Sequence, residues 1–519
     1  MKKICYAVWV GVISFSLACS VGNSRPTSAG TEVDAANKED NASSDGNATG
    51  AYRAQILYFV EDPVKTAKPE DAYRYFKDGL LVVKKGKIVA VGEFNALKGK
   101  VENLIGSRDI SERYRNDLIL PGFIDTHIHY PQTEMIVSYG QQLLEWLTTY
   151  TFPTERLYQD EAHAREVAKV FLRELLRNGT TTALVFGTVH KQSVDALFDE
   201  ASDINMRLIA GKVMMDRNAP DYLIDTPETS FQDTKALIER WHGRNRLLYA
   251  ITPRFAPTSS PEQLNKAAEL KKLYPGVYMH THLSENLSEI EWVKSLFPQS
   301  ENYLDVYDSY RLTGPHSVFA HGIHLSEKEF QVLHDTDSAI AFCPTSNLFL
   351  GSGLFKMREA KKAGREVKVG MGTDVGAGTS FNMLETLNEA YKVVLLQQNG
   401  QQSKVPFSAF EGFYQATLGS ARALELEDKI GTFAPGTEAD FVVLSWSDTA
   451  LQNLRMGRTD QKLSKGEMNE AQALADKLFV LMTIGDDRNI KATYVDGRLA
   501  HQRKNGEYTN RKDWSPIGD

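Results

Sequence analysis

The sequence predicts an α/β fold in which a (β/α)8 barrel of the TIM type carries a small β-sandwich domain built from both chain ends. The centre of the 519-residue chain alternates apolar runs with helical stretches, which is the pattern of a parallel barrel. The flanks on either side contain strand patterns without such helices. The chain is also longer than one ordinary domain, so both units have room.

Residues 1–19 have the pattern of an export signal. Lys2 and Lys3 precede an apolar run over 4–18 that is too short to favour a spanning helix. Ala18-Cys19 resembles the lipobox of bacterial lipoproteins, in which the cysteine is lipidated. We expect an exported, membrane-anchored lipoprotein of the periplasm or outer membrane. A plain signal peptide, or a cytoplasmic chain with a miscalled start, is the alternative.

Residues 20–50 are rich in Ser, Asn, Gly, Asp and Ala and have almost no large apolar residue. Such a segment buries too little surface to order itself, so we expect a disordered tether.

A composite β-domain is expected from residues 51–117 and 418–503. Lys85-Gly86 is a turn signal between two apolar runs and predicts a hairpin. The expected strands of this domain are 55–60, 79–83, 87–91, 440–444 and 493–498.

The barrel is expected over residues 118–417. Helical stretches separate the strands, for example 161–178 and 261–273, and the strand region is close to the barrel size of roughly 250 residues. The eight expected strands are 118–125, 181–186, 207–214, 247–252, 277–282, 317–321, 338–342 and 367–373.

Composition narrows the function. The formal net charge of −8 argues against a nucleic-acid surface, which needs a basic patch. The three cysteines include no Cys-x-x-Cys pair. Any metal must therefore be held by His, Asp or Glu.

The strongest chemical signal is His127-x-His129 at the end of the first barrel strand. Residues i and i+2 of a strand point to the same side. Both imidazoles should therefore face one point at the carboxyl end of the barrel, where barrel active sites lie.

A second pair, His280-Thr-His282, ends the fifth strand and shares a face in the same way. Only one of the two is needed for a metal, and His282 lies nearer the strand end. Glu285 follows on the loop, within reach of a metal-bound water; an ordinary solvated carboxylate is the alternative.

His321 ends the sixth strand, and we prefer it to His324, which we interpret as an ordinary loop residue. Asp374 ends the eighth strand after small residues that let the backbone turn tightly. A structural Asp that caps the next helix is the alternative for Asp374.

Imidazoles and carboxylates from several strand ends favour zinc or iron(II) over magnesium or calcium. Related two-metal hydrolases use a modified Lys at the end of the fourth strand. Here that strand ends Thr252-Pro253-Arg254, without a Lys, so we infer one metal.

The chain resembles the amidohydrolase superfamily, and within it the guanine deaminases, from about Ala51 to Arg503. The superfamily signature is Pro-Gly-Phe-Ile-Asp-Thr-His-Ile-His at 121–129. The motifs similar to guanine deaminases are Leu143-Leu-Glu-Trp146, Tyr150-Thr-Phe-Pro-Thr-Glu155, Pro253-Arg-Phe-Ala-Pro257, Cys343-Pro-Thr-Ser-Asn347 and Gly372-Thr-Asp374.

The resemblance implies hydrolysis of guanine to xanthine and ammonia by a zinc-activated water, with one Zn²⁺ per chain. The resemblance implies that zinc is bound by His127, His129, His282 and Asp374. It implies that Glu285 shuttles protons, that His321 polarises the attacked centre and that Asp374 takes a proton from the water. It also implies that Gln132 and Arg254 hold the purine and that Phe255 stacks on it.

Two other functions remain open. One is another aminohydrolase of the superfamily that acts on adenine, a pterin or a triazine; Gln132 with Arg254 argues against it, because the pair fits an oxo-purine. The other is a catalytically silent barrel used as a scaffold, which would normally have lost metal ligands. We expect a homodimer as the assembled form.

Overall fold

The computed structural model describes residues 48–140, 142–398, 406–504 and 507–510. The expected leader with Cys19, and residues 20–47 of the expected tether, lie outside this part. Gly50, at the end of the expected tether, already begins strand β1. Among the described residues, we find no helix with the length and apolar character needed to cross a membrane.

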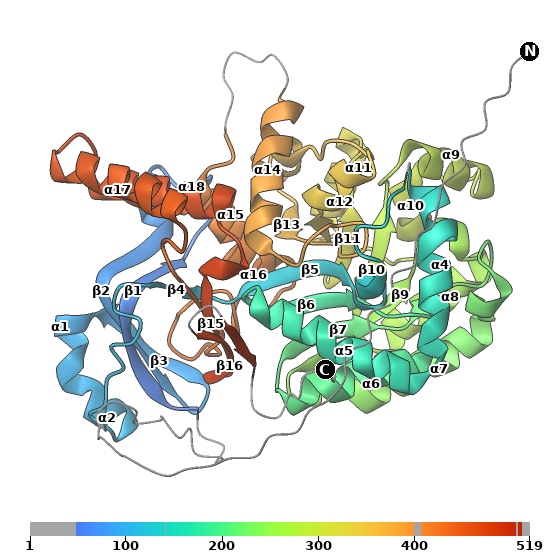
Figure 1. Cartoon of the computed structure of the whole chain (residues 1–519). Coiled ribbons are helices and arrows are strands. Elements are labelled where there is room, and N and C mark those ends of the chain that lie inside the picture. Colours follow the sequence, from blue (N-terminus) through green and yellow to red (C-terminus); the bar gives the residue numbers. More distant parts are fainter. Residues whose placement is uncertain (1–47, 141, 399–405, 505–506, 511–519) are drawn as a thin grey trace, which may run out of the picture. The chain divides into compact units, whose positions relative to one another are not determined.

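The centre of the chain forms the expected parallel barrel (Figure 1). Its strands follow one another in chain order: β5 (Phe123–His129), β6 (Thr180–Phe186), β7 (Arg207–Gly211), β9 (Leu247–Pro253), β10 (Tyr278–Leu283), β11 (Ser317–His321), β12 (Ala339–Phe342) and β13 (Lys368–Met371). Two-residue β8 (Val213–Met214) pairs with β9. The ring closes where Asp374 N donates to the carbonyl of His127 at 2.9 Å.

Helices connect the barrel strands, and the expected helices 161–178 and 261–273 are confirmed. Each begins at a side-chain cap, Asp160 for the first and Ser260 for the second, because these oxygens accept from otherwise unpaired backbone N–H groups. The principal helices are α5 (Glu161–Arg177), α6 (Lys191–Asp203), α7 (Pro227–Trp241), α8 (Pro261–Leu273), α9 (Leu287–Leu296), α10 (Tyr303–Ser309), α11 (Glu327–Asp335), α12 (Pro344–Phe349) and α14 (Met383–Gln397). The shorter ones are α1 (Phe94–Leu97), α2 (Val101–Ile105), α3 (Leu143–Trp146), α4 (Phe152–Glu155), α13 (Met357–Ala360), α15 (Ala409–Tyr414) and α16 (Ser420–Ala423).

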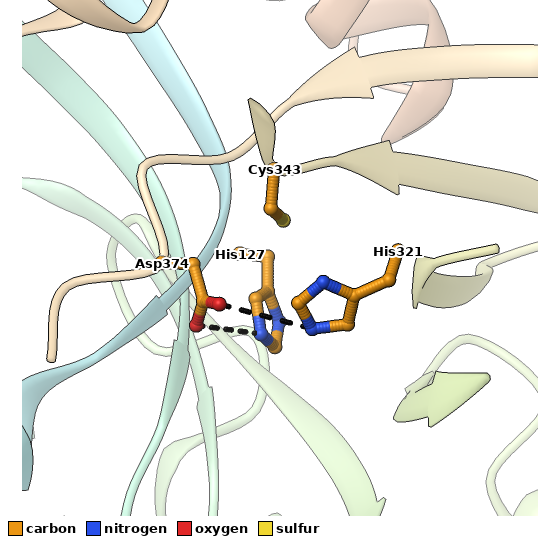
Figure 2. A group of neighbouring side chains, drawn as sticks. All are labelled: His127, His321, Cys343 and Asp374. Atoms are coloured by element: carbon orange, nitrogen blue, oxygen red, sulfur yellow. Dashed lines mark ion pairs between the residues drawn. The ribbon is translucent and has the colours of Figure 1, made fainter. Parts of the chain in front are cut away.

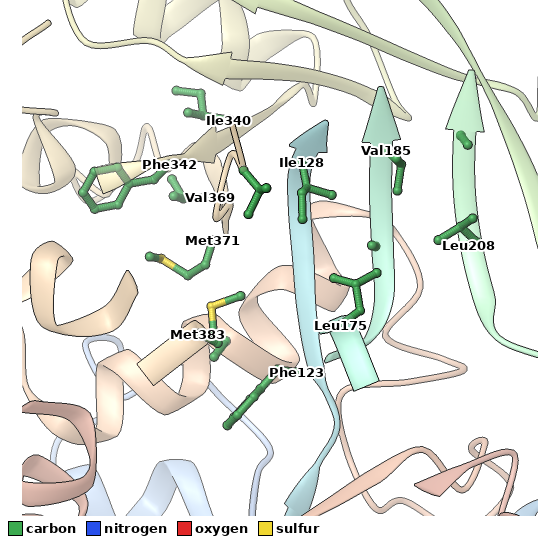
Figure 3. Packing of buried hydrophobic residues seen from close by; sticks show 14 of the residues in the cluster. Phe123, Ile128, Leu175, Val185, Leu208, Ile340, Phe342, Val369, Met371 and Met383 are labelled. Carbon is green, nitrogen blue, oxygen red and sulfur yellow. The ribbon is translucent and has the colours of Figure 1, made fainter. Parts of the chain in front are cut away.

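Alternate residues of the barrel strands belong to two different cores. One set, which includes Val185 and Leu208, packs against helices through residues such as Leu175 of α5 (Figure 3). The other set packs inside the ring, where Tyr278 at the amino end of β10 donates to the carbonyl of Leu424 at 2.5 Å. These apolar side chains fill the inside of the ring at its amino end and leave the carboxyl end for a site.

Both chain ends contribute to the second unit, a single eight-stranded sheet in the order β17-β16-β15-β14-β4-β1-β2-β3. Its strands are β1 (Gly50–Phe59), β2 (Tyr73–Lys84), β3 (Lys87–Glu93), β4 (Leu118–Pro121), β14 (Phe441–Leu444), β15 (Ile490–Val495), β16 (Arg498–Lys504) and β17 (Glu507–Asn510).

The expected single strand 118–125 is in fact two strands. β4 belongs to the eight-stranded sheet and β5 to the barrel, and Gly122 lies between them. A Cβ on Gly122 would lie 2.1 Å from Oγ1 of Thr181. Only glycine permits this close crossing from one sheet to the other.

The expected strand 493–498 is also divided, because Asp496 and Gly497 have φ of 50° and 72° and turn the chain back into β16. An Asp-Gly pair with positive φ favours a tight hairpin turn. Helices α17 (Ala450–Ser464) and α18 (Glu470–Ile484) lie between β14 and β15 and were absent from the expected β-domain.

Candidate active site

A bulge in β5 aims two imidazoles into the barrel mouth. Between Asp125 and Ile128 the strand contains one residue more than its partner β6. His127 and His129 therefore share an inward face and are buried, while Ile128 packs outward with Phe123. A bulge redirects side chains in this way, and bulges are common next to active sites.

Strand β10 supplies the second imidazole pair. Nδ1 of His282 lies 2.7 Å from the carbonyl oxygen of Arg254. A carbonyl can only accept, so Nδ1 carries the hydrogen and Nε2 presents its lone pair, 3.2 Å from Nε2 of His129. Nε2 of His280 instead lies 2.8 Å from Nδ1 of His127 and supports that ring. Of the pair, it is His282 that offers a lone pair to the mouth.

Left-handed backbone conformations place the next two groups. His321 has a φ of 72° and Asp374 a φ of 52°. Such values are uncommon outside glycine and are found where a functional site requires them. Oδ2 of Asp374 lies 3.7 Å from Nε2 of His321, and a dashed line in Figure 2 marks this pair.

These groups fit a metal ion. The ligand atoms of His127, His129 and His282 lie within 4.8 Å of one another. Oδ1 of Asp374 lies 3.2 Å from Nε2 of His127 and 3.3 Å from Nε2 of His129. Nε2 of His127 is buried and makes no hydrogen bond. A buried imidazole nitrogen that faces a carboxylate without a hydrogen bond is what a metal ligand requires.

The imidazoles are also in the right protonation state. Burial lowers the pKa of His129 to about 3, and it lowers the pKa of His282 well below the usual value. A neutral imidazole keeps the lone pair that a metal ligand must donate. Three nitrogen donors and one carboxylate oxygen are typical of zinc or iron(II).

Cys343, after β12, lies beside this cluster (Figure 2). Burial, followed by the negative charge of Asp374, raises the pKa of its thiol well above the usual value. Its Sγ donates to the carbonyl of Ala341 at 3.4 Å. In these surroundings the thiol is favoured over the thiolate.

Glu285 is buried at the edge of the mouth. Its Oε2 lies 3.4 Å from Nε2 of His321, and its Oε1 accepts from Oγ of Ser352 at 3.4 Å. Burial, followed by the charge of Asp374, raises the pKa of Glu285 to about 8. A carboxyl group that holds its proton near neutral pH suits general acid–base work.

A pocket opens over these groups. Its lining combines apolar walls with polar groups: His129, Gln132, Leu143, Trp146, Leu147, Arg254, Phe255, His282, Glu285, His321, Asp374 and Ala377. The structure thus brings the expected site residues to one place, and His127, which is not part of the lining, contacts Asp374. His324 lies apart, with Nε2 2.9 Å from the carbonyl oxygen of Ser352.

Some residues of the site had no role in the sequence analysis. Trp146 lines the pocket. Glu155 is not part of the lining, and its Oε2 accepts a hydrogen bond from Nη1 of Arg254 at 2.8 Å. Asn347 holds His321, with Oδ1 2.9 Å from Nδ1. All three belong to the motifs Leu143–Trp146, Tyr150–Glu155 and Cys343–Asn347, and this membership is the only feature of the sequence that could have indicated a role for them. Their partners lie far away in sequence, so no local spacing reveals the contacts.

The carboxyl end of this parallel barrel carries imidazoles and a carboxylate that fit a metal, together with a second carboxyl group whose pKa is raised. This arrangement is typical of the metal-dependent hydrolases. The amidohydrolase family matches residues 118–500. Guanine deaminase of Escherichia coli is 59% identical over 444 residues, which are 86% of this chain and 95% of that protein.

Solved structures agree. Guanine deaminase from Bradyrhizobium japonicum has a TM-score of 0.82 and 39% identity, covering 88% of this chain and 100% of its own. Guanine deaminase from C. acetobutylicum, with guanine bound in its active site, has a TM-score of 0.74 and 31% identity, covering 87% and 99%. The chain therefore belongs to the amidohydrolase family and, within it, to the guanine deaminases.

Proposed function

We propose that this chain hydrolyses guanine to xanthine and ammonia. The observation that carries the proposal is the placement of Arg254 and Gln132 on the wall of the pocket that Glu285 also lines. The relatives named above are guanine deaminases, and one of them holds guanine in its active site.

His127, His129, His282 and Asp374 would hold one zinc ion. When bound, the metal would lower the pKa of a water molecule to about 7 and so supply a nucleophile at neutral pH. Arg254 and Gln132 would bind the carbonyl and ring N–H edge of the purine, and Phe255 would pack against its face. This orients the amino-bearing carbon towards the metal site.

The protons move through the chain's own carboxylates. Asp374 accepts a proton from the attacking water, and Glu285 donates its proton to the ring nitrogen beside the attacked carbon. His321, 3.4 Å from Glu285, polarises the reacting centre. The proton on Asp374 then passes to the amino group, the C–N bond breaks and ammonia leaves. The hydroxyl proton on the attacked carbon returns to Glu285, which leaves the ring carbonyl of xanthine.

The test is a panel of guanine, adenine, a pterin and a triazine, with ammonia release followed in purified protein. We expect guanine to give the highest kcat/KM. A higher value with another compound would favour a different aminohydrolase, and no ammonia from any compound with full metal content would favour a silent scaffold.

The proposed placement is that of an exported lipoprotein anchored at Cys19, and the proposed assembly is a homodimer. The support for the anchor is the sequence pattern of residues 1–19 alone. Sedimentation equilibrium of the chain from residue 48 onward measures the assembly, and a monomer mass would contradict the dimer.

A further inference from the structure

Glu155 is a buried carboxylate behind the pocket wall, at the end of α4. It is 0% exposed and is not itself part of the pocket lining. The chain reaches it through a widened helical turn, the π-helix Leu147–Thr151, and such turns are frequent at functional sites. A buried carboxylate is expensive unless it is paired, so its partners explain its presence.

The first partner is Arg254. Nη1 of Arg254 donates to Oε1 of Glu155 at 2.9 Å and to Oε2 at 2.8 Å. Both side chains are almost wholly buried. Among the described residues, the hydrogen bonds of this guanidinium to protein run through Nη1, so Nε and Nη2 remain for a bound molecule.

The second partner is Gln132, whose Nε2 donates to Oε1 of Glu155 at 3.3 Å. An ionised carboxylate can only accept, so the amide cannot turn its oxygen towards Glu155. Oε1 of Gln132 therefore faces the other way, against Gly376. A Cβ at Gly376, where φ is 113°, would lie 2.3 Å from this oxygen.

We propose that Glu155 is the positioning residue that sets substrate selectivity, because it fixes a donor on Arg254 and the amide polarity of Gln132 at once. A donor beside an amide of fixed orientation matches a ring carbonyl next to a ring N–H. The inference rests on the proposed function for the identity of the substrate. It also explains why the pocket selects the edge of the substrate that carries the ring carbonyl and the ring N–H.

The test is Glu155→Gln, which keeps the shape and removes the charge. We expect kcat/KM for guanine to fall about 10- to 100-fold, mainly through KM. The preference for guanine over diaminopurine, in which an amino group replaces the ring carbonyl, should fall as well. Metal content should stay at the wild-type value, and calorimetry should show weaker binding of xanthine. Glu145→Gln, on an exposed residue of the same segment, is the matched control.

The double variant with Glu155→Gln and Arg254→Ala distinguishes a positioning role of Glu155 from a general contribution to the stability of the fold. If Glu155 acts through Arg254, its substitution in the Arg254→Ala background should change kcat/KM for guanine far less than in wild type. Additive losses, or a fall in kcat with unchanged KM and selectivity, would overturn the proposal. Glu155→Asp, which keeps the charge, provides a second variant if Glu155→Gln does not fold, and it should retain selectivity. Guanine turnover by the wild type tests the proposed function separately.

Discussion

The carbonyl oxygen of Arg254 lies 2.7 Å from Nδ1 of His282, while the guanidinium of the same Arg254 lines the pocket. One residue therefore orients a metal-facing imidazole with its backbone and faces the substrate with its side chain. A displacement of this short segment after β9 would disturb both subsites together.

His282→Ala should remove both the metal and turnover. The hydrogen bond from Nδ1 of His282 to the Arg254 carbonyl orients the ring so that its Nε2 can bind the metal. Elemental analysis of purified protein and ammonia release from guanine measure the two effects. His324→Ala, which changes a histidine outside the pocket, is the control and should leave both unchanged. Two metals per chain in active wild type would contradict a single site.

Glu285→Gln should retain the metal and lose about 10²- to 10⁴-fold in kcat, the usual contribution of a general acid or base. The amide keeps the shape but cannot donate a carboxylic proton. Steady-state kinetics together with metal analysis provide the measurement, and Glu291→Gln on the exposed face of α9 is the matched control. Near-normal turnover would remove Glu285 from the mechanism.

Arg254→Ala should raise KM for guanine far more than it changes metal content. The backbone carbonyl that orients His282 remains in this variant, whereas the donor to the purine is lost. Initial rates over a range of guanine concentrations measure the effect. The specificity assignment fails if the wild type deaminates adenine better than guanine.

Glu438 should stabilise the joint between the barrel and the eight-stranded sheet in a pH-dependent way. Burial alone would raise its pKa, but hydrogen bonds from Arg207 and the charge of Arg246 outweigh burial and lower the pKa from 4.5 to about 2. The carboxylate is therefore favoured in the folded chain, and its contribution is on the order of 3 kcal/mol at neutral pH.

This contribution is fully present above pH 4.5 and is lost as the pH falls towards 2. Glu438→Gln should thus lower the urea midpoint at pH 7, and the difference from wild type should narrow between pH 5 and pH 3. Glu427→Gln, on an exposed residue, is the control. A difference that is constant over this range would show that the charge of Glu438 has no role.

Cys19→Ala should abolish incorporation of labelled fatty acid into the full-length chain and release it from the membrane fraction. The expectation follows from Ala18-Cys19 after a short apolar run. Fractionation of cells that express each form is the measurement. An unprocessed cytoplasmic chain that begins at Met1 would refute the anchor and leave the active site unaffected.

The sequence alone predicted the parts of this protein that depend on local spacing. The alternation of strands and helices predicted the barrel, and the i, i+2 spacing placed His127 with His129 on one face. The same spacing put His280 and His282 on one face, and only the position nearer the strand end favoured His282, because periodicity says which residues share a face and not what each one contacts. The division of 118–125 between two sheets was missed for the same reason.

Only the tertiary structure decided how the polar groups are held. The bulge in β5 and the left-handed backbone at His321 redirect side chains in ways that strand periodicity does not encode. His282 takes its orientation from a carbonyl 28 residues away, and Arg254 is paired with Glu155 at a separation of 99 residues. Hydrogen bonds require two groups within about 3 Å. At such separations, chain folding alone determines which groups meet.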